Sequence, residues 1–260
     1  MASEASTGTF LQGLERGLAV IRAFSADAPS LTLSEVARSV GITPATARRI
    51  LLTLEELGYV RSDSRRFSLT PRVLALGWAY LSSLDLGELA GPFMEELSAK
   101  TRESCSIATL DLPDIVYVAR VPTSRIMTVA LGVGARLPAY PTSMGRVLLA
   151  GLADDELTSY LATLQAESLT ARTVTSADKL RETVSRARAD GFALVDQELE
   201  LGLRSIAAPI RNSRGRTIAA LNVSAHASRS TPASLRADVL PHLQAAADQI
   251  TTALTHRGHL

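Results

Sequence analysis

Five residues between positions 45 and 53 could read base pairs in duplex DNA. Ala45, Thr46, Arg48, Arg49 and Thr53 share one face when this segment is a helix, because the apolar residues between them fall on the opposite face. Arginine donates in a fixed fork to guanine and to phosphate oxygens, and threonine can contact base edges in the major groove. These residue types at helical spacing therefore indicate a DNA-recognition helix.

Capping signals around this face define two consecutive helices. Thr32 opens a capping box that predicts the start of a first helix, and Gly41 can end that helix in a left-handed conformation. Thr43 before Pro44 predicts the start of the second helix, and Thr43 is also counted among the candidate DNA contacts. The residues of the second helix that we expect to pack inward are Ala47, Ile50, Leu51, Leu54 and Leu57.

A basic hairpin is predicted after the second helix. Gly58 ends that helix, residues 59–61 and 67–69 predict two short strands, and Arg65 and Arg66 lie at the returning edge. Two helices followed by a basic hairpin is the order of a winged helix-turn-helix. A helix-turn-helix also occurs in helical proteins that never bind nucleic acid, and the hairpin favours the DNA-binding interpretation.

Length and composition indicate a globular protein of two domains. The chain has 260 residues, of which 46% are hydrophobic and 20% charged. Its single cysteine, Cys105, excludes an intrachain disulfide, so we expect a buried thiol in a reducing cytoplasm. No stretch approaches the roughly 20 apolar residues of a membrane span, and no secretory signal is visible. We expect residues 1–9 to form a disordered arm.

Apolar segments flank the predicted helix-turn-helix, which we assign to residues 10–70. A stripe in residues 11–24 predicts a first helix that supplies the floor for the other two. Residues 71–87 predict a linker helix that is apolar on more than one face, as is typical of a helix buried between two subunits. A dimer would hold two recognition helices at fixed separation, so a palindromic operator is expected. The stripe of the first helix comprises Leu11, Leu14, Leu18, Ile21 and Phe24.

From position 88 onward the pattern alternates between helices and strands, which indicates a second domain over residues 88–260. The fold class is therefore α/β (α+β), with a winged helix-turn-helix domain joined by a linker helix to an α/β domain. A helix through residues 89–97 begins the second domain. The expected strands are 105–110, 115–120, 126–131, 192–196, 204–211 and 217–224, and the later helices lie near 143–152, 154–164, 177–190 and 232–256.

No constellation of residues indicates an enzyme. Ser143 lies in PTSMG rather than in the GxSxG elbow of hydrolases, and the four histidines all lie after position 225. The pair Gly132 and Gly134 lacks the third glycine of a dinucleotide fingerprint. Asp196 and Glu198 without a histidine or cysteine cluster specify no metal, and we expect them to fix loop geometry. We predict no catalytic residue, no metal and no cofactor.

Five ordered segments resemble the IclR family of bacterial transcriptional regulators: LERGLAVIRAF, GITPATARRILLTLEELGYV, LPAYPTSMGRVLLA, DQELELGLRSIAAPI and AALNVSAHA. The stretches RIMTVALGVGARLPAYPTSMGRVLLA and LVDQELELGLRSIAAPI are especially similar to the branch that controls the β-ketoadipate pathway, the PcaR, PcaU, PobR and CatR type. This branch senses aromatic acids or their ring-cleavage products. The resemblance implies a GAF-like effector domain with a six-stranded sheet, in homodimers that pair into a dimer of dimers.

The resemblance also implies where an effector would bind. The family's loop before a small helix falls on Ser143, Met144 and Gly145, and amides near a helix start can receive an anion. Val195 stands where some members that bind small keto acids carry an aspartate, so a two- or three-carbon keto acid is not expected here. The other implied pocket residues are Ser205, Asn222 and Ser224, with apolar walls near Met127, Leu131, Leu137 and Leu203, and with Arg125 and Arg146 as candidate charges that fit an interface or solvent equally well.

Together these observations predict a cytoplasmic, ligand-responsive DNA-binding regulator of aromatic-acid catabolism. Its effector would be a small aromatic acid or a ring-cleavage dicarboxylate. The expected partners are double-stranded DNA, further copies of the chain and, for an activator, RNA polymerase, with no membrane. Two other interpretations stay open. One is a small-acid-converting enzyme with an accessory DNA-binding domain, and the other is an architectural DNA-binding dimer whose second domain is inert.

Overall fold

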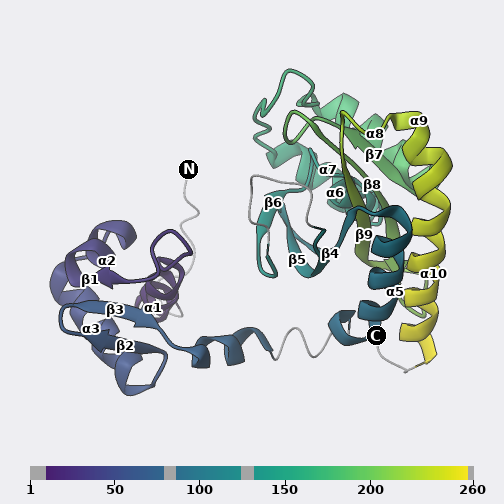
Figure 1. Cartoon of the computed structure of the whole chain (residues 1–260). Coiled ribbons are helices and arrows are strands. Elements are labelled where there is room, and N and C mark those ends of the chain that lie inside the picture. Colours follow the sequence, from purple (N-terminus) through teal and green to yellow (C-terminus); the bar gives the residue numbers. More distant parts are fainter. Residues whose placement is uncertain (1–9, 79–85, 124–131, 257–260) are drawn as a thin grey trace. The chain divides into compact units, whose positions relative to one another are not determined.

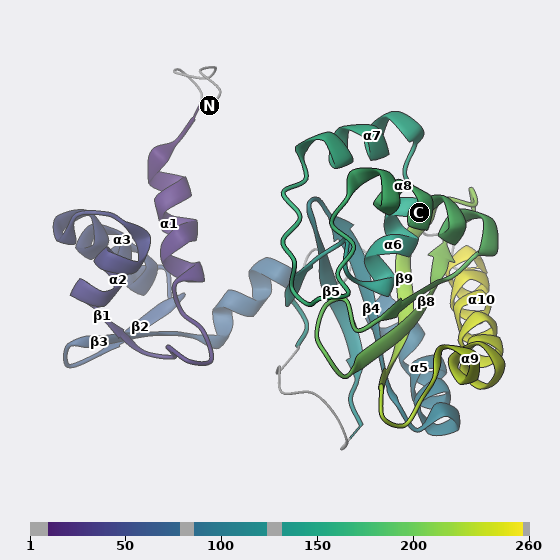
Figure 2. The ribbon, with the colours of Figure 1, turned by 90° about the horizontal axis from the view of Figure 1, so that it is seen from above.

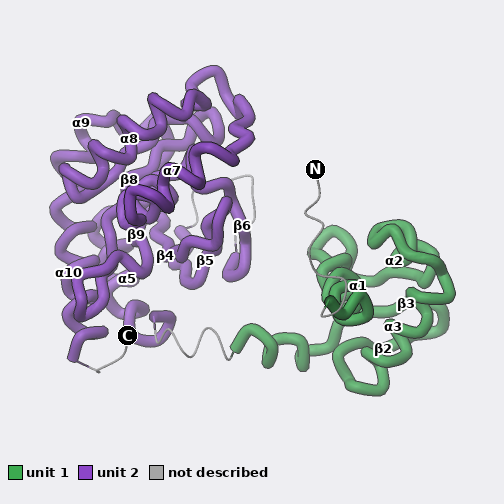
Figure 3. The backbone as a smooth tube through the Cα atoms, turned by 180° about the vertical axis from the view of Figure 1, so that it is seen from behind, with its two compact units in different colours: residues 1–80 green, residues 81–260 purple. Residues whose placement is uncertain are grey.

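The computed structural model describes residues 10–78, 86–123 and 132–256. The chain forms two compact units, residues 1–80 and 81–260, which we call the N-terminal unit and the C-terminal unit (Figures 1 and 3). The predicted arm over residues 1–9 lies outside the described residues. No helix in the described ranges is long and apolar enough to cross a membrane.

The N-terminal unit packs three helices against a small antiparallel sheet, whose strand order is β1-β3-β2. The predicted caps are present: Glu35 N donates to Thr32 Oγ1 (3.3 Å) and Thr32 N donates to Glu35 Oε2 (2.7 Å). Gly41 is left-handed, with φ of 71°. The elements are α1 (Gln12–Arg22), β1 (Leu31–Thr32), α2 (Leu33–Val40), α3 (Pro44–Glu56), β2 (Val60–Asp63) and β3 (Arg66–Leu69).

Two expectations about the core of this unit were wrong. Leu11, Leu14 and Leu18 on α1 are exposed, Leu11 by 72%, because only the C-terminal end of α1, at Val20, is buried in the core. Leu57 is 51% exposed, since α3 ends at Glu56 and the chain turns away from the helical period there. The core of the unit is Val20, Phe24, Val36, Ala37, Ala47, Leu51, Leu54 and Val60.

The start of the predicted linker helix is helical and carries exposed apolar side chains. A 3₁₀ turn, η1 (Pro71–Val73), leads into a helix over residues 74–78, and the rest of the linker up to position 85 lies outside the described residues. Leu74, Leu76 and Trp78 are all more than half exposed in the single chain. An exposed apolar linker is what the sequence led us to expect at a subunit contact. Leu11 at the start of α1 and Leu14 and Leu18 within it are further exposed apolar side chains of this unit.

The C-terminal unit is a six-stranded antiparallel sheet with helices on both faces (Figures 1 and 2). The strand order is β6-β5-β4-β9-β8-β7. The elements are α5 (Leu86–Thr101), β4 (Ser104–Asp111), β5 (Asp114–Val121), β6 (Arg136–Pro138), α6 (Ser143–Ala150), α7 (Asp154–Thr163), α8 (Ala177–Asp190), β7 (Ala193–Asp196), β8 (Leu203–Arg211), β9 (Thr217–His226), α9 (Pro232–Ser234), the π-helical segment η2 (Leu235–Val239) and α10 (Leu240–His256).

Because side chains alternate along each strand, the residues of a strand contribute to two separate cores, one on each face of the sheet. α5 and α10 cover one face, where Met94 and Ile250 pack on strand residues such as Ile107. α6, α7 and α8 cover the other face, where Leu148 packs with the small residues Ala108, Ala207 and Ala220. Small residues on this second face let α6 approach the sheet closely.

Most predicted elements of this unit lie within a few residues of the observed ones. The strand expected at residues 126–131 falls outside the described residues. The edge strand β6 was missed, because three residues are too few to show an alternating pattern. Cys105 is buried as expected: its Sγ donates to Met94 O at 3.3 Å, and burial raises the pKa of the thiol to about 12.

Candidate DNA interface and effector cavity

The outward face of α3 carries the predicted DNA-contacting side chains. Arg48 and Arg49 are exposed, and neither forms an ion pair within the described parts of the chain. Thr43 Oγ1 accepts from Thr46 N at 3.2 Å and lies 2.9 Å from Thr46 Oγ1, so both hydroxyls stabilise the helix start. Thr53 Oγ1 donates to Arg49 O at 2.9 Å. The two guanidinium groups are therefore the donors most available to a base pair.

We expect Arg49→Ala to weaken binding to the specific operator by about 1 to 3 kcal/mol, because one bidentate contact to a base edge is lost. Fluorescence anisotropy with a duplex selected by the wild-type protein from a random library measures this. Arg22→Ala removes an exposed arginine from α1 and serves as the control. Equal operator affinity of the two variants would remove α3 from the recognition role.

Two contacts fix the hairpin relative to α3. The carboxylate of Glu55 on α3 accepts hydrogen bonds from the backbone N–H (3.1 Å) and the hydroxyl of Ser62 on β2. The turn of the hairpin contains Ser64 in a left-handed conformation, with φ of 59°. Arg65 follows at this tip and is exposed. These contacts hold β2 of the hairpin against α3.

Arg66 is committed to the fold in a way that Arg65 is not. Its guanidinium donates to Ser30 Oγ (2.9 Å) and Ser30 O (2.5 Å) and lies 3.7 Å from Glu35 Oε2. Arg66 therefore ties β3 to the segment before β1. The contact of Arg66 with a phosphate stays a prediction. Of the two side chains, the guanidinium of Arg65 is the more available to bind a phosphate.

We expect Arg65→Ala to weaken binding to all DNA sequences alike and to lower the slope of log K against log salt by about 1, since one phosphate contact disappears. Arg66→Ala should instead lower the melting temperature, because its bonds to Ser30 are lost. Salt titrations with specific and scrambled duplexes separate the two effects. An unchanged slope for Arg65→Ala would contradict a phosphate-contacting hairpin.

The register of the C-terminal sheet brings polar side chains together on the face that α6 covers. Ser205 pairs with Val195 on one side and with Ser224 on the other, and Asn222 lies two residues from Ser224 on the same face of β9. Asn222 Oδ1 accepts from Ser106 N at 3.0 Å, and its Nδ2 donates to Ser224 Oγ at 3.1 Å. Asn222 thus fixes the orientation of the Ser224 hydroxyl.

This polar group lines a narrow cavity of about 20 Å³ between the sheet and α6. Of the predicted pocket residues, the structure brings six to it: Ser143, Met144, Leu203, Ser205, Asn222 and Ser224. Val195, which the sequence marked as the position of an aspartate in some members, also lines the cavity. The lining residues that the sequence did not single out are Tyr117, Pro141, Thr142 and Leu199. None of the described side chains that line the cavity is charged.

Two predicted pocket residues that the structure describes, Gly145 and Leu137, do not line this cavity. Gly145 N donates to Thr142 Oγ1 at 3.0 Å, and the residue packs against the backbone of Ala139. Leu137 pairs with Ile115 across β5 and β6. Met127 and Leu131, like Arg125, lie outside the described residues.

The start of α6 has donors that find no acceptor among the described residues. The first amides of a helix lack intrahelical partners, and Thr142 satisfies only that of Gly145. The Ser143 side chain is 1% exposed, and its hydroxyl has no hydrogen-bond partner among the described residues. A buried polar atom left unpaired is destabilising unless a ligand or water satisfies it. Ser143 and Met144 therefore form an anion-receptive corner of the cavity.

Tyr117 adds a second neutral donor. Burial raises the pKa of its phenol to about 12, so the hydroxyl keeps its proton at neutral pH. This residue was not predicted as a contact. The signal that could have found it is the alternation of β5, which sends Tyr117 to the same side as Ile115.

A buried ion pair joins α6, which borders the cavity, to the segment around Glu198. Arg146 Nη2 lies 2.6 Å from Glu198 Oε2, both side chains are almost fully buried, and Arg146 Nε also donates to Tyr140 O at 3.2 Å. Glu198 Oε2 accepts from Val174 N at 3.0 Å as well. The pair joins α6 to the loop that carries Leu199, so Arg146 is occupied by Glu198 instead of offering its charge to a ligand.

Metal binding has no support in the described ranges, which contain no group of three or more histidine, cysteine or acidic side chains able to hold an ion. Asp196, two residues before Glu198, binds Arg204 (Nε to Oδ1, 2.5 Å) and Arg172 (Nη1 to Oδ2, 2.8 Å). Although burial opposes it, bonding to Arg204 holds the pKa of the Asp196 carboxyl below its usual value. These acids organise the β7 to β8 loop.

Comparison with known families identifies both units. The model of the bacterial transcriptional regulator IclR C-terminal domain matches residues 78–252, and that of the IclR helix-turn-helix domain matches residues 13–64. The chain belongs to the IclR family. As an IclR-family protein it is a transcriptional regulator whose N-terminal domain is of the DNA-binding type, and the predicted resemblance is confirmed.

Individual members of the IclR family are similar along nearly the whole chain. The Pca regulon regulatory protein of Pseudomonas putida is 46% identical over 91% of this chain and 82% of its own length. The p-hydroxybenzoate hydroxylase transcriptional activator of Acinetobacter baylyi is 37% identical over 96% and 94%. The crystal structure of an IclR homolog from Microbacterium hydrocarbonoxydans complexed with 4-hydroxybenzoate has a TM-score of 0.83 at 26% identity, covering 93% of this chain and 98% of that one.

Proposed function

We propose that this protein is an effector-responsive regulator of aromatic-acid catabolism that binds an aromatic carboxylate in the cavity beside α6. The observation that carries the proposal is the buried Ser143 hydroxyl at the start of this helix, which has no hydrogen-bond partner in the described ranges. Beside it, the first-turn amides can receive a carboxylate through aligned donors and the helix dipole. The two relatives named for the Pca regulon and for p-hydroxybenzoate hydroxylase, and the homolog with bound 4-hydroxybenzoate, support the ligand class.

The ligand would be oriented by neutral groups. Its carboxylate meets Ser143 and the amides of α6, its ring lies against Met144 and Leu203, and a ring hydroxyl reaches Tyr117 or the serine row of the sheet. An aromatic guest needs on the order of 150 Å³. The cavity of about 20 Å³ must therefore widen, and the Leu199 side of the wall has to move relative to α6.

Movement of that wall is the step by which ligand binding would affect DNA binding. We infer that the protein acts in the cytoplasm as a homodimer, or a dimer of dimers, on a palindromic operator, and that the ligand changes how the subunits pack. The linker helix passes this change to the separation of the two α3 helices. A coupling of about 1 to 3 kcal/mol changes operator affinity roughly 5- to 150-fold. An activator would in addition contact RNA polymerase.

A melting-temperature screen tests the ligand assignment. At a concentration of about 100 times Kd, a ligand that binds only the folded protein adds about 2.7 kcal/mol of stability, a shift of roughly 5 to 10 °C for a domain of this size. We expect the shift with 4-hydroxybenzoate or protocatechuate, and the panel includes β-ketoadipate and muconate. Ser143→Ala should reduce it. No shift with any member of the panel would contradict the proposal.

The same panel distinguishes a regulator from the enzyme interpretation. We propose that the protein has no catalytic activity, since the described lining of the cavity contains serines without a histidine or carboxylate to activate them. Incubation of each acid with purified protein, followed by chromatography, should return it unchanged. Turnover that Ser143→Ala abolishes would favour the enzyme instead.

A further inference from the structure

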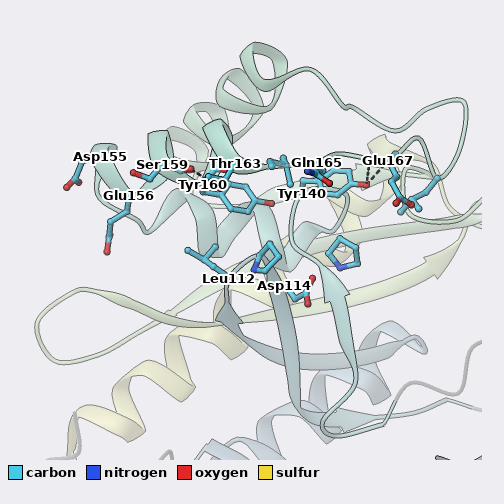
Figure 4. A pocket seen from close by; sticks show the side chains of 14 residues that line it. Leu112, Asp114, Tyr140, Asp155, Glu156, Ser159, Tyr160, Thr163, Gln165 and Glu167 are labelled. Atoms are coloured by element: carbon cyan, nitrogen blue, oxygen red, sulfur yellow. Dashed lines mark hydrogen bonds between the residues drawn. The ribbon is translucent and has the colours of Figure 1, made fainter. Parts of the chain in front are cut away.

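A second and larger pocket lies outside the proposed effector site. It is an open groove of about 860 Å³ between α7, the turn from β4 to β5 and the segment after α7 (Figure 4). Leu112, Tyr140, Tyr160 and Leu169 give it apolar and aromatic walls. Its volume is that of a recognition site rather than of a packing defect.

The groove is acidic. Asp114, Asp155, Glu156 and Glu167 line it, and no basic side chain is among the described residues of the lining. Asp114 is paired with Arg136 (Oδ2 to Nε, 3.2 Å), whereas Asp155 and Glu167 are exposed and make no ion pair within the described ranges. The occupant that this groove favours is therefore cationic.

A tyrosine at the groove has an unsatisfied polar atom. The Tyr160 side chain is 5% exposed, and its hydroxyl has no hydrogen-bond partner among the described residues. Tyr140 differs, because its hydroxyl donates to Glu167 O (2.7 Å) and accepts from Glu167 N (3.0 Å), as the dashed lines in Figure 4 show. Because the Tyr160 hydroxyl is itself buried, the acceptors that the groove offers to an incoming donor are its carboxylates.

The chain itself carries a rigid cationic element that fits this description. In the turn between β8 and β9, Asn212 Oδ1 accepts from Arg214 N and from Arg216 N, both at 3.0 Å. Arg214 and Arg216 are exposed, and neither pairs with a carboxylate in the described part of the chain. Two free guanidinium groups are thus held on a preorganised tip, residues 212–216, which we call the basic tip.

The basic tip and the acidic groove lie at the same edge of the C-terminal unit. Gly215 and Arg216 share the lining of a separate cavity with Gly151 and Leu152, the residues just before α7. α7 then contributes Asp155 and Glu156 to the groove. An edge that presents a cationic tip beside an anionic groove is self-complementary under a twofold axis, because each tip can meet the groove of the other copy.

We propose that a second copy of this chain docks at this edge, with the basic tip of each copy in the acidic groove of the other. Arg214 and Arg216 face Asp155 and Glu167 of the opposite copy, and the arginine stems cover the tyrosine rings. This contact is separate from the exposed apolar linker, so the two together join dimers into a larger assembly. It does not depend on the effector.

Charge reversal on the full-length protein tests this contact. Sedimentation equilibrium should show that Arg214→Glu with Arg216→Glu weakens association into the larger assembly at least about tenfold, and that Asp155→Lys with Glu167→Lys does the same, because like charges then face each other. A chain with all four substitutions should associate again, and so should an equimolar mixture of the two double variants. Matched controls on α8, Lys179→Glu with Arg186→Glu and Glu182→Lys with Asp190→Lys, should associate like wild type.

Recovery in both the quadruple variant and the mixture supports the contact. The proposal is overturned if the double variants associate like wild type, if recovery fails in folded protein, or if the α8 controls lose association equally. A wild-type protein that never exceeds a dimer overturns it too. In that case binding of a basic peptide to the wild-type groove, lost in Asp155→Lys with Glu167→Lys, would assign the groove to another occupant.

Discussion

The variant Ser224→Phe should bind operator DNA as wild type does and lose its response to 4-hydroxybenzoate. Ser224 pairs with Ser205 across the strands and lines the narrow cavity beside α6, where about 20 Å³ is open. A phenyl ring at this position occupies the space into which the ligand would open the cavity. The N-terminal unit keeps its own core, so α3 and the hairpin are unaffected.

Two measurements check this expectation: the melting shift with ligand, which should fall from several degrees to none, and operator affinity with and without ligand. Ser185→Phe makes the same replacement at an exposed position of α8 and should keep the full response. A melting shift of wild-type size in Ser224→Phe would place the effector outside this cavity.

Gly145→Ala should destabilise the C-terminal unit by about 3 kcal/mol, which lowers its melting temperature by roughly 10 °C. A Cβ at Gly145 would lie 1.9 Å from the carbonyl oxygen of Ala139 and 2.5 Å from its carbonyl carbon. These are backbone atoms, so α6 itself has to move away from the segment before it. That movement also displaces the donors at Ser143.

Scanning calorimetry measures this loss, and Gly87→Ala is the matched control. Gly87 lies near the start of α5, and a Cβ there meets no atom within 4 Å. Alanine in that helix should be neutral or stabilising by about 0.5 to 1 kcal/mol. If Gly145→Ala melted like Gly87→Ala, the close approach of α6 to Ala139 would not exist in the protein.

Local signals determined the N-terminal unit to a large extent. The caps at Thr32 and Thr43, the left-handed Gly41 and the inward positions of Ala47 and Leu51 depend on residues at most a few positions apart. Such hydrogen bonds and helical periods act over short distances along the chain, so the sequence displays them directly. The exposure of Leu11 on α1 could not be foreseen, since periodicity shows an apolar face without showing what covers it.

The tertiary structure decided which arginine side chains are available to bind DNA or a ligand. Arg65 and Arg66 are neighbours of the same type, yet the bonds to Ser30, 36 positions away, commit only Arg66 to the fold. Arg146 is likewise neutralised by Glu198, 52 positions later in the chain. Partners this distant leave no periodic signal in a single sequence.

For the cavity beside α6, too, the sequence determined one part and the tertiary structure the other. The sequence, through its resemblance to a family, indicated the small helix at Ser143 and the serines of the last strands. Only the fold showed that Tyr117 joins them, that Gly145 packs on backbone instead, and that the Ser143 hydroxyl is buried without a partner. Burial and unsatisfied hydrogen bonds are properties of the packed layers on both sides of a side chain, and these layers exist only once β4, β8, β9 and α6 have assembled.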